Sequence, residues 1–327
     1  MHILITGGAG YIGSHTAKAV ARAGHTPVVY DSLERGHRWA VRWGPLIEAN
    51  LASVETLRAA IERYSIEAVI HFAAFASVGE SMSQPGLYFR NNFVNTLNLL
   101  EAMRETGVSR IVFSSTAATY GHPLQVPIPE DHPKCPVNPY GESKLMVERA
   151  LHWYGEIHAL RSVALRYFNA AGADPDGEIG EVHHPETHLI PLALAAANGD
   201  LAQLQIYGSD YETPDGTAVR DYIHVADLAA AHLKALDYLA GGGASTALNL
   251  GTGEGVSVRE VVRVTGTVTG RTVPARESAR RAGDPPVLVA DPAQARKALG
   301  WSPGHSSLEE IVATAWEWYR QKDRYSR

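Results

Sequence analysis

Short apolar runs alternate with longer segments of helical periodicity through the first half of the chain. Phe93, Leu97, Leu100 and Met103 recur at helical spacing after Pro85, which predicts one long helix there. Strands that alternate with helices favour a parallel sheet covered on both faces, so we expect a doubly wound α/β domain. Further helices are expected at 11–23, from 53 to 64 and after 138–139, and strands from residue 2 and at 28–30, 46–48, 68–72, 110–114 and 162–166.

A glycine-rich turn joins the first expected strand to the first expected helix. Gly7, Gly8 and Gly10 permit a tight turn and let backbone amides approach a pyrophosphate. Gly13 lets the helix pack closely on the strand, and the first amides of that helix favour an anion. Asp31, at the end of the second strand, is placed to accept hydrogen bonds from an adenosine ribose and would repel a 2′-phosphate. The pattern therefore predicts a Rossmann dinucleotide site for NAD rather than NADP.

The rhythm of the sequence changes after Asn169. Loops rich in glycine, proline and aspartate, at 172–180 and 207–217, separate shorter elements, as expected of a lobe that closes over a ligand. We therefore expect a Rossmann domain and a smaller C-terminal α/β substrate lobe. The first covers residues 1–168 and the second 169–327, with a segment near 222–250 returning to the Rossmann domain.

Composition narrows the class of protein. The 327 residues are 45% hydrophobic and carry a formal net charge of −6 without a long basic run, so neither nucleic acid nor a membrane surface is an expected partner. Cys135 is the only cysteine, which excludes an internal disulfide. No apolar run approaches the ~18 residues of a membrane span, and the first strand leaves no room for a signal peptide. We therefore expect a cytoplasmic protein.

A candidate catalytic pair follows in the chain. Tyr140 and Lys144 stand four residues apart at the start of a capped helix and so share one face. A lysine ammonium beside the phenol would lower the tyrosine pKa from about 10 and make the phenolate a general base for a sugar hydroxyl. Ser115 and Thr116 end a strand at the edge where open α/β sheets bind ligands. We expect a hydroxyl there to share the proton with Tyr140.

Longer motifs give the chain a specific resemblance. The glycine turn Thr6-Gly7-Gly8-Ala9-Gly10-Tyr11-Ile12-Gly13, the Ser115/Thr116 strand end and Tyr140-x-x-x-Lys144 resemble the extended short-chain dehydrogenase/reductase superfamily. Within it, the chain is similar to UDP-glucose (UDP-galactose) 4-epimerases from residue 2 to about Tyr319, and the block Arg-Asp-Tyr-Ile-His-Val at 220–225 is the most specific piece. The other segments that carry this similarity are 71–74, 78–81, 166–172, 215–217 and 249–251.

The resemblance implies a cofactor, a catalytic set and a substrate set. NAD would be held by Gly7, Gly10, Tyr11, Ile12, Gly13, Asp31, Ser32, Asn50, Leu51, Phe72, Ala73, Ala74, Asn92, Tyr140, Lys144 and Phe168. The catalytic set would be Thr116, Tyr140 and Lys144. A UDP-sugar would be held by Thr116, Asn169, His188, Leu189, Gln205, Tyr207, Arg220, Arg281, Asp284 and Leu288. Tyr140 would take the proton of the sugar 4-hydroxyl while hydride passes from C4 to tightly held NAD, and hydride would return to the opposite face of the 4-keto sugar.

Some of these residues have a second interpretation from sequence alone. Arg220 beside Asp221 also fits a structural ion pair, and Arg281 also fits a solvated arginine. A net-acidic protein nevertheless needs cations for a diphosphate, so we favour binding for both. The histidines at 183, 184 and 188 lack the accompanying carboxylate or cysteine pattern of a zinc site, so no metal is expected. The aromatic residues at 316, 318 and 319 are expected to pack in the core.

Four positions depart from the family pattern. Asn50 replaces an aspartate near adenine, and its carbonyl oxygen can still accept a hydrogen bond. Ala76 replaces a lysine near the cofactor, which weakens retention of NAD, and His188 replaces an asparagine near the uridine diphosphate. Leu288 stands where a bulky tyrosine limits the substituent at sugar C2 in narrower enzymes. We hypothesise that this leucine lets the site accept UDP-N-acetylhexosamines.

Other activities share the fold. A nucleotide-sugar 4,6-dehydratase would carry an Asp-Glu pair where this chain has Ala117 and Ala118, and a non-catalytic NAD-binding regulator typically loses the tyrosine or lysine that this chain keeps. A preference for UDP-xylose and UDP-arabinose would depend on the space near Tyr207 and Leu288. The resemblance also implies a homodimer through the helices after residues 85 and 139, which carry apolar residues on more than one face.

Overall fold

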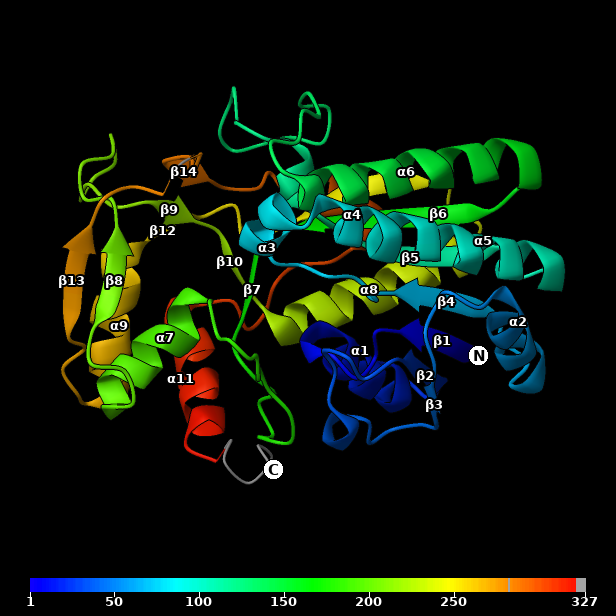
Figure 1. Cartoon of the computed structure of the whole chain (residues 1–327), viewed down its shortest axis with the longest axis horizontal. Helices are drawn as coiled ribbons and strands as arrows, with labels where there is room; N and C mark the ends of the chain where they lie inside the picture. Colours follow the sequence, from blue (N-terminus) through cyan, green and yellow to red (C-terminus); the bar gives the residue numbers. More distant parts are fainter. Residues whose placement is uncertain (282, 322–327) are drawn as a thin grey trace.

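The computed structural model of the chain is built around a seven-stranded parallel sheet in the order β11-β6-β5-β4-β1-β2-β3 (Figure 1). It describes residues 1–281 and 283–321, so residue 282 and residues 322–327 of the expected lobe lie outside the described residues. The strands are β1 His2–Thr6, β2 Thr26–Asp31, β3 Leu46–Glu48, β4 Ala68–His71, β5 Arg110–Thr116, β6 Arg161–Tyr167 and β11 Thr246–Leu250. The predicted doubly wound α/β fold is confirmed.

Helices cover both faces of this sheet, because its central strands are almost continuously apolar and need burial on each side. One face carries α1 Tyr11–Arg22, α8 Val225–Ala240 and α10 Ala293–Leu299. The other face carries α2 Val54–Arg63, α5 Asn95–Thr106 and α6 Pro139–His158. The α8 helix and β11 lie in the sequence between segments that pack away from the sheet, yet they pack on the sheet.

Two predicted helix starts have the expected caps. The Ser53 hydroxyl accepts the amide of Thr56 at 3.2 Å, and Asn138 Oδ1 accepts the amide of Gly141 at 2.8 Å. Pro139 occupies the first turn of α6, where its missing N–H costs nothing. These caps fix the start of the helix that carries Tyr140 and Lys144.

The long helix predicted after Pro85 is confirmed, because helical turns run without a gap from Pro85 to Thr106, and it contains one widened turn. The structure has α3 Val78–Ser83, α4 Pro85–Tyr88, a π-helical turn at Phe89–Val94, and then α5. Within the π turn, the Asn92 amide bonds both backbone groups of Phe75, at 2.8 and 2.9 Å. The apolar repeat continues through this turn because the widened turn changes the helix register without ending the helix.

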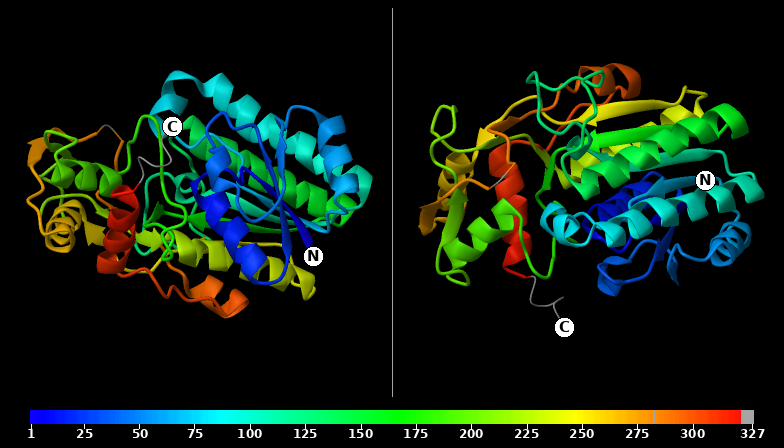
Figure 2. Two further views of the ribbon diagram at one scale, coloured as in Figure 1. Left: turned by 90° about the horizontal axis from the view of Figure 1, so that it is seen from below. Right: turned by 45° about the horizontal axis from the view of Figure 1, so that its top comes forward.

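The remaining elements form a smaller lobe beside the carboxyl ends of the sheet strands (Figure 2). Its helices α7 Leu189–Asn198, α9 Val258–Thr269 and α11 Leu308–Tyr319 share one apolar cluster, in which Trp316 and Tyr319 are buried as expected. Trp318 is also buried. The short strands of this lobe are β7 Asn169–Ala171, β8 Leu204–Tyr207, β9 Val219–Arg220, β10 Tyr222–His224, β12 Val256–Ser257, β13 Ala275–Ser278 and β14 Val287–Leu288. The 3-10 turns Arg38–Ala40 and Ala117–Thr119 belong to the part of the chain around the large sheet, after β2 and β5. Among the described residues, no helix has both the length and the apolar character needed to cross a membrane.

Candidate active site

The glycine turn between β1 and α1 is as tight as the sequence predicts. A Cβ on Gly13 would stand 2.2 Å from the carbonyl oxygen of Gly7, and a Cβ on Gly7 would stand 2.6 Å from the amide nitrogen of Ala73. Gly7 also has a φ of +72°, which favours glycine. Within the described residues, no side chain caps α1 at Gly10, so the amides of its first turn point toward an incoming anion. The turn therefore fits the pyrophosphate of a dinucleotide.

Asp31 lies beside this turn, at the end of β2. Its carboxylate accepts the amide of Ala9 at 3.0 Å and the amide of Leu33 at 2.8 Å. Burial raises the pKa of this carboxyl group, and the two amide hydrogen bonds oppose that rise. Each carboxylate oxygen keeps acceptor capacity for a ribose hydroxyl, so the residue fits its expected role.

The structure brings Thr116, Tyr140 and Lys144 together where β5 meets the first turns of α6. Lys144 Nζ donates a hydrogen bond of 2.8 Å to the Ser114 carbonyl oxygen. Burial raises the pKa of the Tyr140 phenol, and a hydrogen bond with Thr116 partly opposes the rise. The expected lowering of this pKa by Lys144 is therefore not observed. The physical reason is that burial has the largest effect on the Tyr140 phenol, and burial also lowers the pKa of Lys144 to about 7.

The two hydroxyl groups of the strand end have different partners, because successive side chains of a strand point to opposite faces. Thr116 faces Tyr140. The Ser115 hydroxyl instead donates to Glu148 at 2.5 Å, and Glu148 forms a buried ion pair with Arg166 at 2.5 Å. The structure therefore places Thr116, and not Ser115, beside the Tyr140 hydroxyl.

A buried polar network behind β5 was missed in the sequence. Arg166 Nη1 donates to the Tyr120 hydroxyl at 2.9 Å, and that hydroxyl donates to Asn249 Oδ1 at 2.7 Å. Arg166 and Asn249 stand in segments that carry the family resemblance, but their spacing gives no sign of a shared network. Together with Glu148, they hold the strand end rigidly beneath the site.

The expected substrate residues lie in three groups on the lobe side. Arg220 pairs with Asp284 at 2.5 Å, so the sequence interpretation of an ion pair with Asp221 is wrong. Asp221 is buried and accepts backbone amides of the adjacent loops instead. The Arg281 guanidinium lies 4.0 Å from the ring centre of Tyr207. Both arginines are therefore held on the lobe by neighbours that were also expected in the substrate set.

Leu288 is the third group, and it lies with Phe168, which was expected to bind NAD. Both pack against the buried cluster of Ala117, Tyr120 and Ile128, directly after Thr116. Leu288 lies opposite Arg220 in the pairing of β14 with β9. The β9–β14 pair therefore brings Arg220 close to the cluster that follows the end of β5.

The remaining substrate candidates are more dispersed. Gln205 on β8 accepts a hydrogen bond of 2.7 Å from Ser278, and the amide of Asn169 donates to the Asp221 carbonyl at 3.1 Å. His188 and Leu189 lie at the start of α7, where His188 precedes the first helical residue.

Two expected NAD residues are committed to other contacts. Asn50 Oδ1 accepts the amide of Ala52 at 2.9 Å, so its carbonyl oxygen closes a local turn. Asn92 is buried and uses its amide on Phe75 and Ser143. The other expected residues Ser32, Leu51, Phe72, Ala73 and Ala74 follow the carboxyl ends of β2, β3 and β4, at the edge of the sheet that carries the glycine turn.

A glycine turn with its acid, and a Thr–Tyr–Lys set at the end of a central strand, define a nucleotide-dependent enzyme of the short-chain dehydrogenase type. Residues 3–251 match the family described as the NAD dependent epimerase/dehydratase family, and the chain belongs to this family.

Relatives cover the chain almost from end to end. A UDP-glucose 4-epimerase of Lacticaseibacillus casei is 50% identical over 98% of this chain and 97% of its own. The crystal structure of UDP-glucose 4-epimerase from Brucella ovis in complex with NAD is 53% identical, with a TM-score of 0.96 over 97% of this chain and 98% of that chain. A UDP-glucose-4-epimerase structure from Stenotrophomonas maltophila, with bound NAD and formylated UDP-arabinopyranose, is 40% identical, with a TM-score of 0.96 over 99% of both chains.

Proposed function

We propose that this chain is an NAD-dependent UDP-sugar 4-epimerase that interconverts UDP-glucose and UDP-galactose. The observation that carries the proposal is the contact between the Tyr140 and Thr116 hydroxyl groups at the end of β5, on the same sheet edge as the glycine turn. The relatives named UDP-glucose 4-epimerases support the choice of substrate. Ala117 and Ala118, which follow Thr116, offer no acid or base for a dehydratase.

We assign cofactor binding and substrate binding to two different parts of the fold. Residues 1–168, with the segment near 222–250, would hold the cofactor, and the rest of the chain from residue 169 would hold the UDP-sugar. Gly7, Gly10 and Gly13 allow close approach of the pyrophosphate, and Asp31 accepts the ribose hydroxyl groups. When bound, NAD supplies the acceptor for hydride from the sugar.

Other protein residues accept the proton and bind the diphosphate. Thr116 orients the Tyr140 phenol, which accepts the proton of the sugar 4-hydroxyl as a general base. Lys144 holds the first turn of α6 against β5 and supplies positive charge when it is protonated. Arg220 and Arg281 bind diphosphate oxygens, for which the arginine fork is suited.

The experiment is to incubate the purified chain with UDP-galactose and no added nucleotide, and to measure UDP-glucose. Conversion is expected, because the proposed epimerisation has no net change of oxidation state and would not consume NAD. Tyr140→Phe should lower kcat by about 10²–10⁴-fold. A regulator would keep its function without the phenol. Absence of conversion even with added NAD would contradict the proposed reaction.

We also propose a homodimer that is cytoplasmic. Trp153 and Ile157 stand one turn apart on α6 and are 61% and 66% exposed, which is unusual for large apolar side chains. They lie on the helical layer formed by α4, α5 and α6 (Figure 1). Light scattering after gel filtration should give a dimer for the natural chain and a monomer for Trp153→Glu with Ile157→Glu. A monomeric natural chain would contradict this assembly.

The free, exposed Cys135 supports a reducing compartment.

A further inference from the structure

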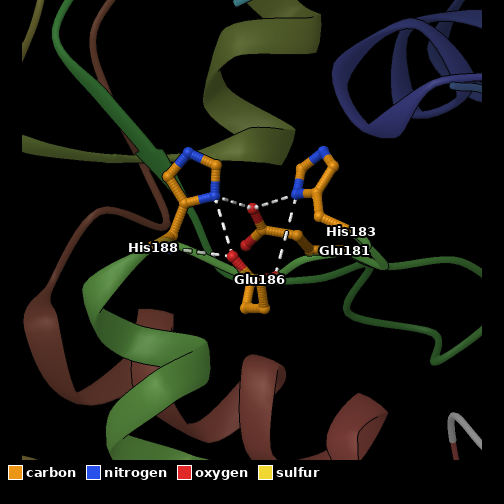
Figure 3. Close-up of side chains that lie close together, drawn as sticks. All are labelled: Glu181, His183, Glu186 and His188. Atoms are coloured by element: carbon orange, nitrogen blue, oxygen red, sulfur yellow. Dashed lines mark hydrogen bonds and ion pairs between the residues drawn. The ribbon is translucent and has the colours of Figure 1, made fainter. Parts of the chain in front are cut away.

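Four titratable side chains that take no part in the proposed proton and hydride transfers converge in the loop before α7 (Figure 3). The ligating atoms of Glu181, His183, Glu186 and His188 all lie within 4.8 Å of one another. Glu181 and Glu186 supply the carboxylates that the sequence argument against a metal overlooked. We propose that these four residues bind a divalent transition-metal ion, and that Zn²⁺ is the ion that suits them best.

The distances within this Glu₂His₂ cluster match the edges of a coordination shell. His188 Nδ1 lies 2.7 Å from Glu181 Oε1 and 3.1 Å from Glu186 Oε1. His183 Nδ1 lies 3.1 Å from Glu181 Oε1 and 3.8 Å from Glu186 Oε2. Zn–N and Zn–O bonds of about 2.0–2.2 Å place the ligands of a tetrahedral ion about 3.3 Å apart. The measured separations lie on both sides of that value, and imidazole with carboxylate is a donor set that Zn²⁺ accepts.

Hydrogen bonding accounts for only part of the cluster: Glu186 Oε1 accepts the amides of Thr187 and His188 at 2.7 and 2.8 Å and lies 3.1 Å from His188 Nδ1. Glu181 Oε1 and His183 Nδ1 are fully buried, and among the described residues neither has a partner in hydrogen-bond geometry, although they lie 3.1 Å apart. The Glu181 side chain is only 7% exposed. Glu181 Oε1 has the two imidazoles as ion-pair partners, at 2.7 and 3.1 Å, but no well-aligned hydrogen bond, and an ion at the centre would satisfy both buried atoms.

A second acidic cluster in the same loop already has a cationic side chain as its partner. Lys18 Nζ lies 2.5 Å from Asp174, 2.7 Å from Asp176 and 2.7 Å from Glu178, so an ammonium group already supplies the positive charge there. Within residues 1–281 and 283–321, no lysine or arginine forms an ion pair with Glu181 or Glu186. The two histidines are their charged partners. The Glu₂His₂ cluster therefore needs either a metal ion or two protonated imidazoles to balance its carboxylates.

The position of the cluster indicates what the ion would do. The Glu181 carbonyl accepts the indole N–H of Trp318 at 3.1 Å, and the His183 ring lies edge-on to Tyr11, 6.5 Å between centroids. His188 is the residue before α7. A bound ion would therefore tie the loop between the start of α1 and the start of α7, and would stabilise the folded chain.

The test uses the full chain, stripped with a chelator, desalted and titrated with ZnCl₂ by calorimetry and with CoCl₂ by visible absorption. We expect one equivalent of either ion to bind, the absorption bands of four-coordinate Co²⁺, and a higher Tm with Zn²⁺. His183→Ala and His188→Ala should each weaken binding at least about tenfold. Circular dichroism checks that both variants fold. The Co²⁺ spectrum of the natural chain tests the site even if they do not.

The control variants are matched to the loop. His184→Ala removes an exposed histidine next to the cluster, and Asp176→Asn alters the cluster that Lys18 already neutralises. Both should bind Zn²⁺ like the natural chain. The proposal is overturned if the natural chain shows no saturable binding, as expected of two protonated imidazoles, or if binding survives in both His183→Ala and His188→Ala. Either result leaves the proposed epimerase reaction untouched, because conversion of UDP-galactose is measured separately.

Discussion

Lys144 Nζ donates a 2.8 Å hydrogen bond to the backbone carbonyl of Ser114, and this bond ties the first turns of α6 to the end of β5. Tyr140 stands one helical turn before Lys144, so the same tie holds its phenol beside Thr116. The lysine thus has a positional role that does not depend on its charge. The effect of Lys144 on the structure can therefore be measured separately from its effect on proton transfer.

Lys144 should make the stability of the fold rise with pH above neutrality. Burial lowers its pKa to about 7, whereas an unfolded lysine has a pKa of about 10.4. Between these values the unfolded chain binds one more proton, so the free energy of unfolding increases with pH. The gain should be on the order of a few kcal/mol. Urea unfolding from about pH 6.5 to about 9.5 measures it. Lys144→Met should lose this rise, and parallel curves for the two proteins would refute the assignment.

Gly13→Ala should abolish NAD binding. The new methyl group would stand 2.2 Å from the Gly7 carbonyl oxygen, so the turn must open and the α1 amides must move away from the pyrophosphate. Fluorescence titration with NADH checks the loss. Gly79→Ala in α3 is the matched control, because its Cβ would meet no atom within 4 Å. Equal affinities of the two variants would show that the turn does not hold the dinucleotide.

Glu148→Ala should destabilise the chain strongly. The change removes one partner of a buried ion pair and leaves the Arg166 charge without compensation, at a cost of about 3–5 kcal/mol. It also releases the Ser115 hydroxyl behind the strand end. Chemical denaturation measures the free energy of unfolding. Glu105→Ala, which breaks the exposed pair with Arg58, should cost much less. Similar losses for both variants would argue against the buried network.

Leu288→Tyr should narrow the substrate range. Leu288 packs with Phe168 beside the end of β5, and a tyrosine there would fill space next to the sugar. We expect kcat/KM for UDP-N-acetylglucosamine to fall at least about tenfold relative to UDP-glucose. Both substrates are compared in the natural chain and the variant. If the natural chain turns over UDP-glucose but not UDP-N-acetylglucosamine, the tolerance assigned to Leu288 is wrong.

The sheet and its dinucleotide turn follow closely from local patterns. Apolar strands, glycine spacing, Asp31 and the Asn138 cap each act over a few residues, so the sequence predicts them. The π-helical turn within the helix after Pro85 could not be predicted. The Asn92 amide is fixed by Phe75, which lies 17 positions earlier and on another segment. The local periodicity of apolar residues cannot indicate such a contact between separate segments.

By itself, the sequence determined the fold class and the family resemblance, and it predicts a catalytic set of Thr116, Tyr140 and Lys144. Only the tertiary structure decided that Thr116 rather than Ser115 faces Tyr140, and that Arg220 pairs with Asp284. The reason is physical: a strand sends neighbouring side chains to opposite faces, and an ion pair forms between groups that folding brings together across 64 positions. The pKa values of Tyr140 and Lys144 likewise follow from burial, and the spacing of residues in the sequence does not reveal how deeply each side chain is buried.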